Sequence, residues 1–328
     1  MVPVTFSTFR PGGTALSPSF PGQILSPPER TAPSNPGLPL TTKDKAATLI
    51  EALPYLQRFR GKTLLIKIGG SAMDNPDLVS SLMRDIVFLE VAGINPVLVH
   101  GGGKAISSAM EAAGLEARFV GGLRVTSPEA IATVENTLGN TINPELVNLI
   151  NQHGGRATGI PGTGVFEARR IQGTGENGEA VDIGRVGEVE SCHTDDILYA
   201  TTSDIVPVVS PLGRETGTGK TLNINADLAA AALACTLKPA KLVYVSDVPG
   251  LLADPANPDS LIPSVTPGEA ETLIKSGIIS GGMIPKIRSA TEALEAGVEK
   301  VHFIDGRTPH TILLEIFTPE GVGTEITR

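Results

Sequence analysis

The sequence has 328 residues, of which 41% are hydrophobic and 4% aromatic, and it contains no tryptophan. Its formal net charge of −9 argues against a nucleic-acid-binding protein, which normally has a basic face, and no apolar run approaches the ~18 residues that span a bilayer. Its two cysteines, Cys192 and Cys235, fit neither a zinc-site spacing nor a disulfide framework, so we expect a soluble protein of a reducing compartment with no nucleic-acid or membrane partner.

The first 40 residues differ in composition from the rest. They hold nine of the 26 prolines and only three charged side chains, Arg10, Glu29 and Arg30. Such a segment buries too little apolar surface to offset the entropy lost on ordering, so residues 1–42 are predicted to be a disordered tail. Their serine and threonine content leaves a targeting segment open, which would place the protein in a plastid rather than in the cytoplasm.

Residues 43–60 predict an amphipathic helix. Apolar residues recur there at helical spacing, Pro54 lies inside the segment, and Gly61 ends it. The helix packs either on its own subunit or on another, because its apolar stripe must be covered. The stripe consists of Leu49, Ile50, Leu53, Leu56 and Phe59.

From residue 61 onward, strand and helix patterns alternate, which indicates parallel strands in a layered α/β fold. The predicted strands are Thr63–Ile68, Val97–Val99, Lys241–Val245 and Val301–Ile304. The predicted helices are Pro76–Val91, a helix from Gly103 to Gly114, Asn225–Leu237, Thr266–Ser276, Met283–Ala296 and Pro309–Phe317. Between them, Val165–Ile171 and Ala180–Val189 alternate apolar and polar residues around a turn and predict a β-hairpin.

Two glycine-rich segments resemble phosphate-binding motifs, but each lacks a feature that the motif requires. Gly217–Thr221 lacks the first glycine of a Walker loop, because Arg214 stands at that position. Gly173–Gly178 has the spacing of a dinucleotide-binding loop, but another strand pattern follows it instead of a helix. We therefore interpret the second segment as the tip of the hairpin.

Three other glycine loops each open a helix or end a strand, and two of them carry a lysine. Lys67 precedes Gly69-Gly70, His100-Gly101-Gly102-Gly103 joins a strand to a helix, and Gly281–Lys286 opens another helix. Backbone N–H groups of such loops and helix N-termini bind anions, and lysine adds a point charge. Their combination predicts a phosphate-binding cleft.

Two further motifs complete the pattern, Gly122-Leu123-Arg124-Val125-Thr126 and Asn223-Ile224-Asn225-Ala226-Asp227. With the three glycine loops, they make the chain resemble the amino acid kinase family and, within it, the acetylglutamate kinases. The resemblance runs from about residue 43 to the end of the chain. It implies an open αβα sandwich around a mainly parallel sheet, with an acyl-amino-acid-binding lobe (61–235) and a nucleotide-binding lobe (236–328).

The resemblance also implies a reaction, the ATP-dependent phosphorylation of the side-chain carboxylate of N-acetyl-L-glutamate in arginine biosynthesis. Lys67 and Lys286 would stabilise the transferring phosphoryl group, and Asp227 would orient both lysines. Mg²⁺ would arrive with ATP, since the chain offers no metal cage of its own. The acyl amino acid would be held by Gly102, Gly103, Arg124 and Asn223, and the nucleotide by Gly69, Gly70, Asp247, Gly250, Leu252, Ile278 and Ser280.

An N-terminal helix before the first strand is typical of the arginine-inhibited hexamers of that family. The resemblance therefore implies inhibition by L-arginine and a homohexamer built as a trimer of dimers. The matching arginine-site residues are Tyr55, His302, Glu315 and Gly321. Two alternatives remain: another kinase of the family, acting on glutamate, aspartate or UMP, and a catalytically silent sensor of arginine or nucleotide.

Overall fold

The computed structural model describes residues 41–328, except 176–177, 255 and 320. The chain divides into two units, Met1–Lys45 and Ala46–Arg328. The N-terminal segment, which the sequence predicts to be a disordered tail or a targeting segment, lies almost entirely outside the described residues. The predicted N-terminal helix is present as α1 (Thr42–Phe59), which includes Pro54.

The centre of the larger unit is an eight-stranded sheet with the strand order β16-β18-β17-β13-β1-β2-β10-β5. All neighbours from β17 to β5 run parallel, and only β18 pairs antiparallel with β17. This confirms the predicted, mainly parallel sheet. In sheet order the strands are Ser264–Val265, Thr324–Ile326, Lys300–Asp305, Lys241–Ser246, Thr63–Ile68, Asn95–His100, Val206–Val209 and Ala157–Ile160.

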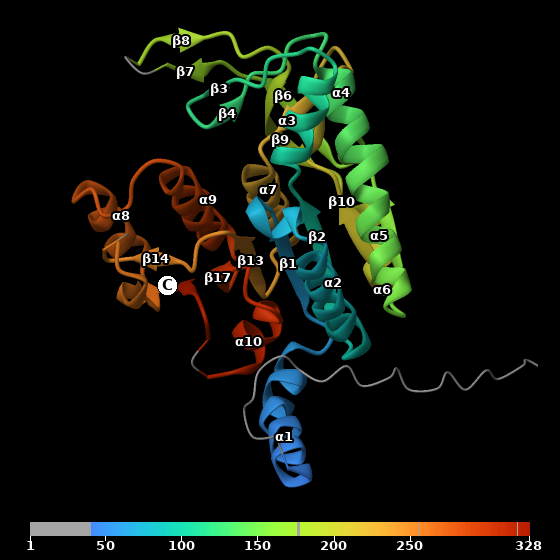
Figure 1. Ribbon diagram of the computed structural model, residues 1–328, viewed down its shortest axis with the longest axis vertical. Helices are drawn as coiled ribbons and strands as arrows, with labels where there is room; N and C mark the ends of the chain where they lie inside the picture. Colours follow the sequence, from blue (N-terminus) through green and yellow to red (C-terminus); the bar gives the residue numbers. More distant parts are fainter. Residues whose placement is uncertain (1–40, 176–177, 255, 320) are drawn as a thin grey trace, which may run out of the picture. The chain divides into compact units, whose positions relative to one another are not determined.

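Helices cover both faces of this sheet because its strands are apolar on both sides (Figure 1). Leu64, Ile66 and Ile68 of β1 join one hydrophobic cluster, whereas Leu65 joins a second. The first cluster includes α2 (Pro76–Val91), α3 (Gly103–Ala112), α5 (Asn143–Gln152) and α10 (Thr311–Phe317). The second includes α6 (Asp195–Thr202), α7 (Ala226–Leu237), α8 (Pro267–Lys275) and α9 (Met283–Ala296). The αβα sandwich is therefore confirmed.

The predicted hairpin is present, with a later second strand. β6 (Phe166–Arg170) pairs antiparallel with β9 (Val186–Cys192), and both form a small closed barrel with β11 (Leu212–Glu215) and β12 (Thr221–Ile224). The segment predicted to start the second strand instead forms β8 (Ala180–Val181), which pairs with β7 (Gly173–Thr174). The first glycines of Gly173–Gly178 thus begin a hairpin connection, as expected.

One helical region was not predicted from the sequence. Residues 131–152 form α4 (Ile131–Glu135), a π-helical stretch (Asn136–Ile142) and α5 in direct succession. The π-helical stretch contains Gly139 and Asn140, which have poor helix propensity, and this weakens the sequence signal. π-Turns within helices occur often at functional sites. Here Leu138, from this stretch, reaches the cavity described below.

The two predicted lobes contribute to the same sheet, since β1 and β2 come from one and β13 and β17 from the other. The boundary at residue 235 stays a prediction. Within the described part of the chain, no helix is both long and apolar enough to span a bilayer.

Candidate active site

A cavity of about 180 Å³ lies where β1 and β2 end and where α3 and α7 begin. In parallel α/β sheets, ligands bind beyond the carboxyl ends of the strands, because loops and helix N-termini meet there. The cavity joins the predicted motifs. Its lining includes Lys67, Gly69, Gly70, Gly101, Gly102, Gly103, Arg124, Asn223 and Asp227.

Two lysines converge on one carboxylate beside this cavity. The Lys67 Nζ atom lies 2.7 Å from Asp227 Oδ1, and the Lys286 Nζ atom lies 3.6 Å from Asp227 Oδ2. Lys67 comes from β1 and Lys286 from the first turns of α9, and both pair with the start of α7. The structure therefore brings together the two lysines and the aspartate that the resemblance named, and their catalytic roles stay a prediction.

The fold places Asp227 firmly. Asn225 caps α7, since its side-chain oxygen accepts hydrogen bonds from the backbone N–H groups of Asp227 and Leu228. Burial opposes ionisation of the Asp227 carboxyl, but Lys67 and Lys286 outweigh it and keep its pKa below the ordinary value. The acid is thus a carboxylate whose orientation is fixed by the helix start and by both lysines.

The glycines Gly69 and Gly70 leave room for neighbouring groups of the protein. A Cβ atom added at Gly69 would lie 2.2 Å from Lys67 Nζ, so a larger residue there would displace the ammonium group from its present position. Gly70 has a φ of +68°, which favours glycine, and a Cβ there would lie 3.2 Å from the backbone nitrogen of Asp247. Larger side chains at Gly69 or Gly70 would therefore disturb the position of Lys67 or Asp247.

Arg124 enters the cavity from the small ribbon of β3 (Phe119–Val120) and β4 (Leu123–Arg124). Its guanidinium stacks on the Phe119 ring, with 4.6 Å between Cζ and the ring centroid. Its Nη2 atom donates to the Gly103 carbonyl at 2.6 Å and to Ser107 Oγ at 2.9 Å. Burial lowers the pKa of Arg124, which still leaves the group charged. A rigid cation thus faces the glycine loop.

Asn223, on strand β12 of the barrel, forms a hydrogen bond with the segment that follows this ribbon. Its Nδ2 atom donates to Thr126 Oγ1 at 3.1 Å, and Thr126 forms an isolated parallel bridge with Gly184. Asn223 and Arg124, which lie 99 positions apart in the chain, therefore line the same cavity.

The predicted nucleotide residues divide into two groups. Gly69 and Gly70 line the cavity, and Asp247 lies against Gly70. The others lie outside the lining, on the loop after β13, on β14 (Leu251–Leu252) and on the α8–α9 connection. The nucleotide role of both groups stays a prediction.

The side chains at the cavity do not form a metal cage. Across the described residues, no group of three or more His, Cys, Asp or Glu side chains is arranged to hold a metal ion. The one carboxylate lining the cavity, Asp227, is already paired with two lysines. A divalent cation here would need most of its oxygen ligands from the substrate or from water.

A second polar cavity, of about 480 Å³, lies between the end of α1, β17, β18 and the segment after α10. All four predicted arginine-site residues line it, namely Tyr55, His302, Glu315 and Gly321. Gly321 has a φ of +64°, and a Cβ there would lie 3.0 Å from Glu315 Oε2. The structure thus brings together residues that are 266 positions apart.

The charges of this second cavity are closely paired. Glu315 accepts a hydrogen bond from His302 Nδ1 and others from the Val322 and Gly323 backbone N–H groups. Burial of Glu315 opposes ionisation, but these bonds keep its pKa lowered. The Lys241 Nζ atom lies 2.9 Å from His302 Nε2, and burial lowers the pKa of Lys241 to about 8.

Sequence reasoning missed several residues of the two cavities. Ser107 and Phe119 hold Arg124, and Lys241, Lys300 and Glu325 line the second cavity. A lysine at the start of the buried strand β13 was the one available signal for Lys241, because lysine is rarely buried unless it is paired. The other four had no local signal.

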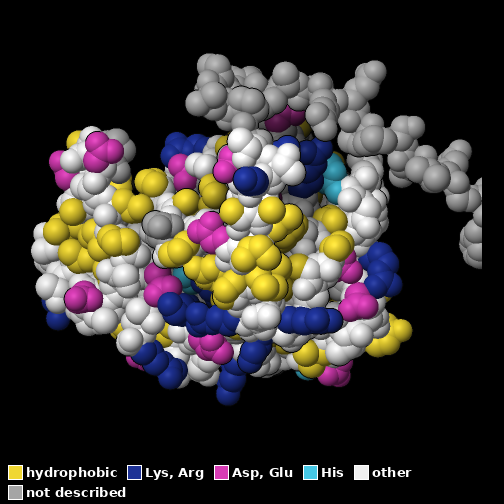
Figure 2. Space-filling model, turned by 90° about the horizontal axis from the view of Figure 1, so that it is seen from below, with side chains coloured by type: hydrophobic (Ala, Val, Ile, Leu, Met, Phe, Trp, Pro, Cys, Tyr) yellow, Lys and Arg dark blue, Asp and Glu magenta, His cyan; other side chains and the backbone are white. Residues whose placement is uncertain are grey.

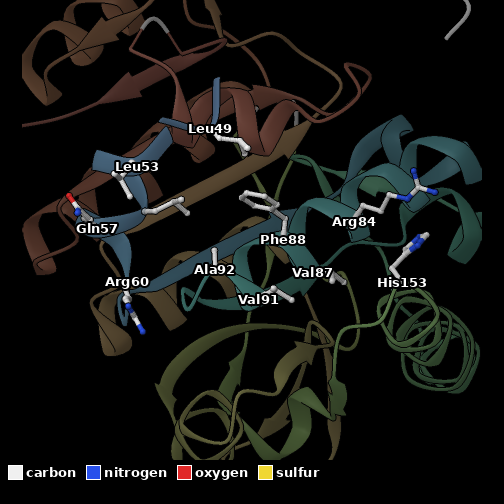
Figure 3. A pocket seen from close by; sticks show the side chains of 11 residues that line it. Leu49, Leu53, Gln57, Arg60, Arg84, Val87, Phe88, Val91, Ala92 and His153 are labelled. Carbon is white, nitrogen blue, oxygen red and sulfur yellow. The ribbon is translucent and has the colours of Figure 1, made fainter. Parts of the chain in front are cut away.

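An apolar groove of about 830 Å³ runs between α1 and α2. Figure 2 shows hydrophobic side chains gathered on this face, and Figure 3 shows Leu53 of α1 and Phe88 and Val91 of α2 lining the groove. Leu49 is 69% exposed and Val91 is 74% exposed, which is unusual for large apolar side chains grouped on one face.

Comparison with known proteins agrees with this architecture. Residues 62–305 match the model of the amino acid kinase family. An acetylglutamate kinase of Akkermansia muciniphila is 63% identical over 285 residues, which cover 87% of this chain and 96% of that protein. An acetylglutamate kinase of Acinetobacter baumannii is 46% identical over 291 residues, covering 87% of this chain and 95% of that protein.

Solved structures share the fold. An N-acetylglutamate synthase from Neisseria gonorrhoeae, complexed with coenzyme A and N-acetyl-glutamate, matches with a TM-score of 0.75 and 27% identity. The match covers 86% of this chain but 63% of the synthase, so this chain spans less than two thirds of that protein. A Giardia carbamate kinase matches with a TM-score of 0.56 at 19% identity, over 81% of this chain and 99% of that kinase, and supports the fold alone.

These findings define the class of protein. The chain belongs to the amino acid kinase family. Within that family it is a kinase of the acetylglutamate kinase type, since relatives of that name match 87% of its length at up to 63% identity.

Proposed function

We propose that this enzyme transfers the γ-phosphoryl group of ATP to the side-chain carboxylate of N-acetyl-L-glutamate, an early step of arginine biosynthesis. The observation that carries the proposal is the pairing of Lys67 and Lys286 with Asp227 beside a cavity lined by glycine N–H groups and Arg124. The names of the relatives supply the substrate, which the cavity alone would leave open between several carboxylic acids.

The reaction needs positioning and charge stabilisation rather than a covalent nucleophile. The carboxylate oxygen of the substrate attacks the γ-phosphorus, and the bond between that phosphorus and the β,γ-bridging oxygen breaks, releasing ADP. No general base is needed, because the attacking carboxylate is ionised at neutral pH. Lys67 and Lys286 neutralise charge on the transferring group, and Asp227 keeps both ammonium groups in place.

The substrate and nucleotide have separate contacts in this proposal. The N–H groups of Gly102 and Gly103 hold the reacting carboxylate, whereas Arg124 and Asn223 bind the α-carboxylate and the acetamido group. ATP lies along Gly69 and Gly70 toward Asp247 and the predicted residues beyond it. Mg²⁺ enters on the ATP phosphates, which fits the lack of a metal cage among the described residues.

A substrate comparison tests the proposal. Purified enzyme is given Mg²⁺-ATP with N-acetyl-L-glutamate, L-glutamate, L-aspartate or UMP, and acyl phosphate formation is trapped with hydroxylamine, with ADP release measured in parallel. We expect turnover with N-acetyl-L-glutamate and little with the other three. Comparable rates on glutamate or aspartate, or ADP release with UMP, would point to another kinase of the family. No turnover with any acceptor would favour the silent sensor.

We also propose that L-arginine inhibits the enzyme by binding in the second cavity. Arginine carries two cationic groups and one carboxylate, and this cavity offers both signs of charge, from Glu315 and Glu325 and from Lys241 and Lys300. A second solved structure of the Neisseria synthase, matching at a TM-score of 0.72 and 26% identity, is complexed with L-arginine, which supports the class of ligand.

We also propose that the enzyme is a cytoplasmic homohexamer, built as a trimer of dimers, in which the apolar groove between α1 and α2 is a contact between copies of the chain. The large apolar side chains of Leu49 and Val91 are exposed on it, and a second copy of the chain would cover them. Light scattering of the full chain measures the assembly directly. A monomeric mass would contradict this part of the proposal and leave the reaction untouched.

A further inference from the structure

The glycine loop at residues 101–103 turns all three of its carbonyl groups toward hydrogen-bond donors of the protein. The Gly101 N–H itself donates to the Ile68 carbonyl at 2.7 Å, so we infer that the loop offers the N–H groups of Gly102 and Gly103, rather than its carbonyl oxygens, to the cavity that it lines. The bonds are from His100 Nδ1 to the Gly101 carbonyl (2.9 Å), from the Ile106 N–H to the Gly102 carbonyl (2.9 Å), and from Arg124 Nη2 (2.6 Å) and Ser107 Oγ (3.0 Å) to the Gly103 carbonyl.

Two of these carbonyls are secured by the helix, but the first is not. The Gly102 carbonyl makes the first intrahelical bond of α3, and the Gly103 carbonyl lies within its first turn. The Gly101 carbonyl precedes the helix and is held by the His100 imidazole. Without that bond, the Gly101–Gly102 peptide would rotate easily, since neither residue has a side chain to restrict it.

The direction of this peptide decides what the substrate meets. No cis peptide bond occurs in the described residues, so the Gly101 C=O and the Gly102 N–H point in opposite directions. With the carbonyl directed at the imidazole, the Gly102 N–H is directed away from it. A rotated peptide would instead present a carbonyl oxygen, which repels a carboxylate.

His100 itself is fixed from the other side by Asn143. The Asn143 Nδ2 atom lies 3.2 Å from His100 Nε2 and donates to the Val208 carbonyl at 2.8 Å. An amide NH₂ group has two hydrogens and both have an acceptor here, so Nε2 accepts and the imidazole proton must reside on Nδ1. Asn143 therefore selects the one neutral tautomer that can donate to the Gly101 carbonyl.

The surroundings of the pair keep the imidazole neutral and immobile. His100 is fully buried, and burial lowers its pKa to about 4. Asn143 is held closely as well, because a Cβ atom added at Gly159 would lie 2.2 Å from its Oδ1 atom. Asn143 stands where the π-helical stretch passes into α5, so this irregular helix places the amide beside the strand.

We propose that His100 and Asn143 are a positioning pair that orients the Gly102 N–H toward the substrate carboxylate. Neither side chain lines the active-site cavity, so both act through the Gly101–Gly102 peptide. The inference rests on the proposed function, because it assigns the N–H group to the acceptor carboxylate of that reaction. It gives the buried histidine a role in acceptor binding.

Two substitutions of His100 separate this role from packing. The amide nitrogen of asparagine can occupy the place of Nδ1, whereas that of glutamine can occupy the place of Nε2. His100→Asn therefore keeps a donor for the Gly101 carbonyl, and His100→Gln loses it while keeping a polar group toward Asn143. Steady-state kinetics are measured for N-acetyl-L-glutamate and for ATP, with thermal unfolding of each variant.

We expect His100→Gln to raise the KM for N-acetyl-L-glutamate by about 10-fold or more, because one hydrogen bond to its carboxylate is lost, and to leave the KM for ATP unchanged. His100→Asn should stay near the wild-type KM even if its melting temperature falls. Equal acceptor kinetics for the two variants, or an equal rise in the KM for ATP, would overturn the inference. If the wild-type enzyme fails to phosphorylate N-acetyl-L-glutamate at all, the proposed function fails instead.

Discussion

The two polar cavities of this protein use similar side chains but differ in their balance of charge. In the active-site cavity, Lys67 and Lys286 share the single carboxylate of Asp227, and Arg124 adds a third cation. This leaves a surplus of positive charge next to free helix N–H groups, which suits phosphate and carboxylate ligands.

In the second cavity, each carboxylate has its own partners. Glu315 is bonded to His302 and to two backbone N–H groups, and Glu325 accepts from Lys300 at 2.7 and 2.8 Å. Lys241 contacts His302, so no single sign of charge dominates. The difference between the cavities lies in their charge balance: the first has more cations than carboxylates, whereas the second pairs cations with carboxylates, which fits the anionic substrates proposed for the first and the arginine proposed for the second.

The largest effect is expected when one of the two lysines that share Asp227 is removed. We expect Lys286→Ala to lower kcat by about 10³-fold, because the ammonium group stabilises charge that is largest in the transition state. Initial rates at saturating ATP and N-acetyl-L-glutamate measure the effect. Lys275→Ala, an exposed lysine at the end of α8, serves as the matched control. A variant affected only in KM would mean that Lys286 binds substrate without acting on the phosphoryl group.

Each polar cavity has a buried histidine nearby, His100 or His302. Their protonation should make the free energy of unfolding depend on pH. Burial lowers the pKa of His100 from 6.5 to about 4, so between these values the unfolded chain binds a proton that the folded protein does not. The free energy of unfolding should therefore fall as the pH is lowered from 6.5 to 4, by up to about 3 kcal/mol from this group.

Urea unfolding at pH 7 and pH 4.5 measures this dependence, and His100→Asn should reduce it. His302→Asn should reduce it in the same direction, because burial also lowers the pKa of His302. A pH dependence that is identical in wild type and His100→Asn would show that His100 is not held neutral.

The smallest expected effect concerns regulation. Tyr55→Ala should raise the arginine concentration for half-inhibition by about 10-fold, equivalent to about 1.4 kcal/mol, because it removes one wall of the second cavity. Tyr55→Phe keeps the edge contact with Phe317 and should have a smaller effect. Deletion of residues 1–60 should weaken inhibition at least as much. A truncated enzyme with full arginine sensitivity would separate α1 from the inhibitor site.

The sequence predicted the regular parts of the fold because they depend on local patterns. Apolar strands followed by amphipathic helices predicted β1, α2, β2 and α3 to within a few residues, and the glycine loops marked the phosphate side of the sheet. The candidate catalytic residues Lys67, Asp227 and Lys286 could be named because each lies in a short motif, and their roles stay a prediction. The acyl-amino-acid specificity came from resemblance rather than from spacing.

The remaining features depend on contacts that no local pattern encodes. The π-helical stretch carries Asn143 to His100, 43 positions earlier, and the bridge between Thr126 and Gly184 brings Arg124 near Asn223. The later start of β9 follows from its pairing with β6 and β12 in a barrel. Such pairings are set by the whole chain, so short motifs cannot reveal them.

Helix α2 runs from the short helix beside the active-site cavity to α10, which contributes Glu315 to the second polar cavity. It starts just after the short helix at Gly70–Asp74, whose first residue lines the active-site cavity. Near its other end Phe88 packs on Phe317, with 5.6 Å between ring centroids, and Asp85 Oδ1 lies 2.7 Å from His310 Nδ1 beside α10.

Sixteen residues make α2 roughly 24 Å long, so a tilt of about 5° around its end near α10 would move its other end, next to Gly70–Asp74, by about 2 Å. A misplacement of about 1 Å can already cost an enzyme about 100-fold in rate, so a displacement of that size would matter. We therefore expect α2 to be the element through which a small movement of α10 would reach Gly70 at the edge of the active-site cavity.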